Sequence, residues 1–132
     1  RLLFSFPFKL HMSWIIVASA LNVNVLVDSC AAPPAVLNAV AVVTLSFLAG
    51  LVVAFVVVAP PEPLVPLVAA LAFAAVADEL SEPEALMSTD RFNPHAWPEE
   101  VVLGLHHACA GLSALAGVAW LAALARGARS PV

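Results

Sequence analysis

The sequence has few charged residues and few cysteines. Charged residues make up 11% of the 132 residues, against roughly 25% in ordinary soluble domains, and 63% of the residues are hydrophobic. A soluble chain this small cannot bury so much apolar surface. The net charge of -4 excludes a basic groove for nucleic acid. The two cysteines, Cys30 and Cys109, are too few for a disulfide framework or a thiolate metal site. The composition therefore indicates an integral membrane protein that binds no nucleic acid.

Catalytic motifs are also missing from the sequence. It contains no Gly-rich phosphate loop, nucleophile elbow, paired-cysteine motif or His-Glu zinc signature. The long apolar runs contain no Asp, Glu, Lys or Arg, whereas proton relays and ion pathways depend on charges inside the membrane. We therefore expect a protein that is not an enzyme, and not a pump or transporter acting alone.

Apolar runs predict an all-α fold with about four transmembrane helices, in one membrane domain that covers residues 1–132. The expected spans are residues 10–27, 35–59, 64–80 and 101–125. The second is the clearest, because its 25 residues carry no charge and proline pairs stand on both sides of it. Proline is well suited to the start of a helix and ends a helix that reaches it.

The third expected span is the shortest. It has 14 apolar residues, 64–77, before Asp78 and Glu79, whereas a full crossing takes about 20. Extending the span to residue 80 places two carboxylates near one headgroup layer. A re-entrant or interfacial helix is therefore the alternative for this segment.

The charges predict how the chain is oriented. The loop 78–100 carries seven carboxylates against one arginine, so it must lie in water. Four of the five basic residues stand near the chain ends: Arg1, Lys9, Arg126 and Arg129. Basic residues accumulate on the untranslocated side of a membrane, and an even number of spans places both basic ends there. The distribution therefore favours four spans, with both termini on one side and the acidic loop on the other.

A histidine pair, His106 and His107, lies inside the last expected span. Neighbouring residues on a helix point about 100° apart, so both rings cannot bind one metal, but either could be an axial ligand of a haem or chlorophyll. We expect His11 at the opposite membrane face, which disfavours a bis-histidine haem in this chain. The alternative is a histidine that is hydrogen-bonded to another helix. The first expectation is therefore no cofactor and no metal, with chlorophyll or haem as the alternative.

Small residues recur at four-residue spacing in two of the expected spans. These predicted packing stripes are Ser46, Gly50 and Ala54 in the second span, and Cys109, Ser113 and Gly117 in the fourth. Small side chains let membrane helices approach closely. Asn22 and Asn24 point about 200° apart on a helix, so at least one of them should face a partner helix.

These features together predict a non-catalytic accessory or structural subunit of a larger, energy-transducing membrane complex. Its expected partners are other membrane subunits and lipids. The first residue is Arg1 instead of Met, which indicates either an incomplete sequence or a mature chain whose leader was removed. A removed leader would favour the mitochondrial inner or thylakoid membrane, with a bacterial plasma membrane as the alternative. The alternative function is a pigment- or haem-binding membrane subunit that uses a histidine of the last span.

Overall fold

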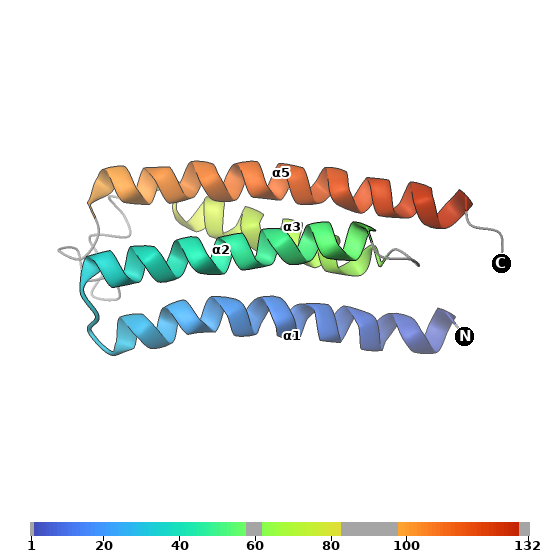
Figure 1. Ribbon diagram of the computed structural model, residues 1–132, viewed down its shortest axis with the longest axis horizontal. Helices are drawn as coiled ribbons and strands as arrows, with labels where there is room; N and C mark the ends of the chain where they lie inside the picture. The colour runs from blue at the N-terminus through green and yellow to red at the C-terminus, as the bar shows by residue number, and fades with distance from the viewer. Residues whose placement is uncertain (1, 58–61, 83–97, 130–132) are drawn as a thin grey trace.

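The computed structural model describes residues 2–57, 62–82 and 98–129, and within these residues the chain is helical. The helices are α1 (Leu2–Ser29), α2 (Pro34–Val57), α3 (Leu64–Glu79) and α5 (Glu99–Arg129). They lie side by side as a bundle, and the beginning of α1 and the end of α5 are at the same end (Figure 1). The prediction of an all-helical membrane fold with about four helices is thereby confirmed.

Two of the helices extend beyond the predicted spans. Helix α1 begins at Leu2 and continues through Pro7, although we expected its apolar span to begin at residue 10. Helix α5 covers Glu99–Arg129 and so adds residues on both sides of the expected 101–125. Both additions carry charged side chains. The helices are therefore longer than predicted, but the uncharged stretches between their charged residues keep the predicted lengths.

The other two helices lie close to their predicted bounds. Helix α2 begins at Pro34, one residue before the expected start, and the expected end at residue 59 falls outside the described residues. Helix α3 covers 16 residues, which gives a length of about 24 Å. By length and composition, three helices are able to cross a membrane: Ser5–Ser29, Pro34–Val57 and Glu99–Ala128. Helix α3 is shorter than the roughly 30 Å hydrocarbon core.

Helix α3 lies at the centre of the bundle, packed against α1, α2 and most extensively α5. Val65 and Phe73 are each 1% exposed, and Phe73 joins Val17 of α1, Leu48 of α2 and Ala116 of α5 in the core. The helix runs from the end of the bundle where α2 finishes towards the end where α5 begins (Figure 1). Unlike a re-entrant segment, it does not return to the end at which it starts.

Helix α5 faces the bundle with a buried stripe at seven-residue spacing. The stripe consists of Val102, Cys109, Ala116 and Ala123, each at most 4% exposed. Seven residues are close to two helical turns, so these side chains lie on one line along the helix. Because three of the four are small, the backbone of α5 can approach α3 closely.

A polar contact joins α1 to α2. The Asn24 carboxamide donates to the Thr44 hydroxyl oxygen at 3.1 Å, which confirms the expectation that at least one of the two asparagines faces a partner helix. On α1 itself, the buried Ser13 hydroxyl donates to the Lys9 carbonyl at 2.8 Å. Asn22 is exposed on the other side of α1.

Candidate functional site

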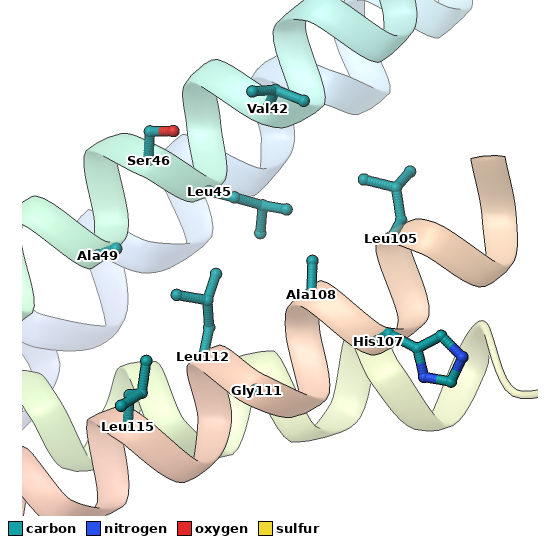
Figure 2. Close-up of a pocket in the computed structure, with 10 residues that line it drawn as sticks. All are labelled: Val42, Leu45, Ser46, Ala49, Leu105, His107, Ala108, Gly111, Leu112 and Leu115. Carbon is teal, nitrogen blue, oxygen red and sulfur yellow. The ribbon is translucent and has the colours of Figure 1, made fainter.

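An apolar groove of about 460 Å³ lies between α2 and α5. Figure 2 shows Leu45 of α2 and Leu112 of α5 pointing towards each other across this groove. Small residues such as Ala49 and Gly111 line it and leave room between the two helices. The full lining is Val42, Leu45, Ser46, Ala49, Leu105, His107, Ala108, Gly111, Leu112 and Leu115.

A second hollow of about 220 Å³ adjoins the groove and shares Ala49, Leu112 and Leu115 with it. It reaches Phe73 and Ala116, which belong to the core. The apolar lining of the two hollows therefore extends from the groove to residues of the core.

His106 caps the end of α3. Its Nδ1 lies 2.7 Å from the carbonyl oxygen of Ala77, and Ala77 is two residues before the last residue of that helix. The last carbonyls of a helix lack a partner within the helix, and the amide of Ser81, which could serve Ala77, bonds to the Asp78 carbonyl at 3.1 Å. His106 therefore supplies the missing donor, which places the proton on Nδ1.

His107 has different surroundings. Its side chain is exposed, and its ring centroid lies 5.0 Å from that of His106, with 65° between the ring planes. Figure 2 shows the His107 ring at the edge of the groove, pointing away from Leu45 and Leu112. The adjacent rings thus have separate environments, and among the described residues no group of three or more His, Cys, Asp or Glu could hold a metal ion.

The predicted stripe of α5 faces α3. Cys109 is buried, the Ser113 hydroxyl donates to the Ala70 carbonyl at 2.9 Å, and Gly117 is half-buried. The buried residues of α5, however, follow a seven-residue spacing instead of the predicted four-residue spacing. Of the three predicted residues, Cys109 belongs to this buried stripe. The recurrence of small residues at 109, 116 and 123 was the available signal, but α5 is so rich in alanine that many other spacings fit equally well.

The predicted stripe of α2 lies on the outside of the bundle. Ser46, Gly50 and Ala54 are all exposed, and Ser46 also lines the groove. A Cβ atom added at Gly50 would have no neighbour within 4 Å. Packing through this stripe therefore requires another molecule and stays a prediction.

Two basic side chains hold the end of the bundle where the termini lie. The Lys9 ammonium pairs with the Glu62 carboxylate at 2.5 Å, and the Arg126 guanidinium donates to the carbonyl of Val56. Glu62 precedes α3 and Val56 is near the end of α2, so the two contacts tie α1 to the start of α3 and α5 to the end of α2. The sequence analysis used these basic residues to predict how the chain is oriented in the membrane. It did not predict which groups they contact.

A comparison with protein families adds to this geometry. The family model described as TSPO-like protein matches residues 1–92, which include α1, α2 and α3 but not α5 with its histidine pair. Comparisons with curated proteins and with solved structures gave no match. The match covers more than half of the chain, and the chain therefore belongs to the TSPO-like protein family, whose members are multi-span membrane proteins.

Proposed function

We propose that this protein is a non-catalytic accessory subunit that packs against other helices in a larger membrane complex. The observation that carries the proposal is the exposed position of Ser46, Gly50 and Ala54 on α2. A face of small residues lets the backbone of a neighbouring helix come close, and such packing drives helix association in lipid. Within the described residues, no other helix of the bundle covers this face.

The host that we infer is an energy-transducing complex of the mitochondrial inner or thylakoid membrane, with a bacterial plasma membrane as the alternative. The apolar runs 10–27, 35–59 and 101–125 carry no charged residue, which supports a role that leaves proton and ion movement to other subunits. Membrane fractionation, followed by mass spectrometry of the proteins that co-migrate with the chain in mild detergent, tests this inference. Migration of the chain without a companion protein would contradict it.

The substitution Gly50→Leu tests the packing face directly. The free space around Gly50 accepts a larger side chain, and replacing glycine in a helix favours the helix by roughly 0.8 to 1 kcal/mol. The folded chain should therefore persist, while the bulky side chain keeps a neighbouring helix away. We expect Gly50→Leu to release the chain from its complex during purification.

A matched control is Gly104→Leu, because Gly104 is also exposed and open but belongs to neither stripe. This variant should co-purify like the wild type. Wild-type yields of the partner proteins with Gly50→Leu would refute the proposed packing face.

A second candidate function is the binding of a haem or chlorophyll through His106. A histidine that ligates a metal commonly donates its other ring N–H to a carbonyl, and the Nδ1 contact of His106 with Ala77 has this form. That contact leaves Nε2 as a base that could serve as an axial ligand. His107→Gln is the control for His106→Gln, and absorbance of the purified complex is the measurement. Loss of a pigment band in His106→Gln alone would favour this second function.

A further inference from the structure

Polar side chains mark the same two levels on neighbouring helices of the bundle. At the end where the termini lie, Lys9 of α1 pairs with Glu62, just before α3, at 2.5 Å. At the other end, the Nδ1 atom of His106 on α5 lies 2.7 Å from the carbonyl oxygen of Ala77, the residue before Asp78. The start of α3 is therefore level with Lys9, and its end is level with the histidine pair of α5.

The lengths between these two levels agree from helix to helix. Along α1, Lys9 and Asp28 lie about 28 Å apart, and no charged residue stands between them. Along α5, His107 and Arg126 also lie about 28 Å apart without a charge between them. Helix α3 covers about 24 Å. The hydrocarbon core of a typical bilayer is about 30 Å thick, and a tilt of the helices would make the apolar band of the bundle thinner still.

Helix α3 meets the lipid with one of its sides. Leu71 is 62% exposed, and Ala74, Ala75 and Asp78 are exposed on the same side of the helix. Lipid chains therefore contact α3 where the apolar length of the bundle is shortest. Because a carboxylate is costly in hydrocarbon, the headgroup layer beside α3 has to reach Asp78 and the exposed Glu79.

We propose that the lipid partner of this surface is a thin bilayer, with a hydrocarbon layer of about 24 to 28 Å. The histidine pair then lies at the headgroup level, and residues 99–105 of α5 extend beyond it. The opposite assignment places both histidines in hydrocarbon and extends the apolar band of α5 from Glu100 to Arg126, about 39 Å. Neither α1 nor α3 matches that length, and α2 carries no charge that marks a level. The inference depends on the four-span arrangement and is independent of the proposed accessory role.

The depth of Leu103 distinguishes the two assignments. A nitroxide is attached to Leu103→Cys in the full chain with Cys30→Ser, in palmitoleoyl phosphatidylcholine liposomes, and EPR compares its collisions with oxygen and with a water-soluble nickel chelate. Leu103 is 37% and Leu115 66% exposed, and Leu115 lies near the middle of the band. The Cys30→Ser chain gives the background from the buried Cys109.

We expect the nickel chelate to relax the label at Leu103→Cys several-fold more than the label at Leu115→Cys, because the first label lies in the headgroup layer or in water. Oxygen-dominated relaxation of the same size at both positions would overturn the proposal.

Lipid thickness tests the band itself. Thermal unfolding of the wild-type chain is measured in phosphatidylcholine liposomes whose monounsaturated chains lengthen in steps from myristoleoyl to erucoyl. Because hydrophobic mismatch destabilises a spanning protein, the midpoint should be highest with myristoleoyl or palmitoleoyl chains and should fall from oleoyl to erucoyl. A midpoint that is highest with oleoyl or longer chains, or that does not depend on chain length, would overturn the proposal.

Two double variants show which charges limit the band. Asp78→Leu with Glu79→Leu lengthens the apolar part of α3 and should move the best chain length upwards. Glu99→Leu with Glu100→Leu is the matched control, because these charges lie outside the proposed band and should leave the best chain length unchanged. All four positions are exposed, so both variants should fold. A shift with Glu99→Leu and Glu100→Leu alone would show that the band ends at the start of α5, and would overturn the proposal.

Discussion

At the scale of the residue, the polar side chains within the helices identify which helices are neighbours. Asn24 bonds to Thr44 across α1 and α2, Ser113 bonds to the backbone of α3, and His106 caps that same helix. In the described part of the chain, no buried side-chain nitrogen or oxygen lacks a hydrogen bond. Complete hydrogen bonding is expected in an apolar environment, because an unpaired polar group there raises the free energy of the folded state.

The cap of α3 leads to a prediction about the histidine pair. His106→Leu removes the donor to the Ala77 carbonyl, and a buried polar group left without its partner costs about 1 to 3 kcal/mol. We expect the free energy of unfolding to fall by this amount. His106→Gln keeps a hydrogen-bonding group and should lose less.

The measurement is reversible denaturation in mixed detergent micelles, followed by circular dichroism. The exposed His107 provides the control, because His107→Leu should change the free energy of unfolding by less than about 0.5 kcal/mol. Equal losses in His106→Leu and His107→Leu would show that the contact with Ala77 does not stabilise the bundle.

At the scale of the element, the existence of the helices could be predicted and their packing faces could not. Long uncharged runs and proline pairs mark where α2 begins, since few other structures can place such a run in a bilayer. Which face of α5 is buried was not predictable, because alanine and leucine occur on every side of that helix. A histidine of the last span that is hydrogen-bonded to another helix was among the expectations, but the choice of His106 and of α3 was not predictable, because it depends on how α5 packs against α3.

The seven-residue stripe of α5 gives a prediction for that element. Ala116 is 1% exposed and lies against the core with Phe73, so Ala116→Leu overfills this contact and should cost about 1 to 3 kcal/mol of unfolding free energy. The matched control is Ala110→Leu, the same change at an exposed position of the same helix. It should stay within about 0.5 kcal/mol of the wild type.

Thermal unfolding in detergent can compare these two variants. A lower midpoint for Ala116→Leu than for Ala110→Leu is the expected order. Equal midpoints would mean that the seven-residue stripe is not the close-packed side of α5.

At the scale of the whole molecule, the basic side chains of the described residues lie at one end of the bundle and most of the acidic ones at the other. Lys9 is near the start of α1 and Arg126 near the end of α5, and these helix ends lie at the same end of the bundle (Figure 1). Glu62 pairs with Lys9 there, whereas Asp78 and Glu79 end α3 and Glu99 begins α5 at the other end. The charge distribution of the sequence suggested this separation, because four of its five basic residues flank the outer helices. The groove between α2 and α5 could not have been predicted, because it depends on how these two helices are spaced.

The short helix α3 decides the topology of the chain. With α3 as a complete crossing the chain has four spans, whereas a re-entrant α3 would leave three. Helix α3 has only 16 residues, so contact with lipid can stabilise it little. Packing against the other helices stabilises it instead. The central claim, a four-span membrane protein with both termini on one side, therefore rests on α3.

The most direct test is thiol labelling in sealed, oriented vesicles with a reagent that does not cross membranes. The probes are the native Cys30, in the turn after α1, and Gly127→Cys, near the end of α5, the latter in a Cys30→Ser background; both positions are exposed. The buried Cys109 should react slowly in every variant. We predict that Cys30 and Gly127→Cys react from opposite sides of the membrane, because α2, α3 and α5 separate them and all three cross. Reaction of both from the same side would contradict the four-span account.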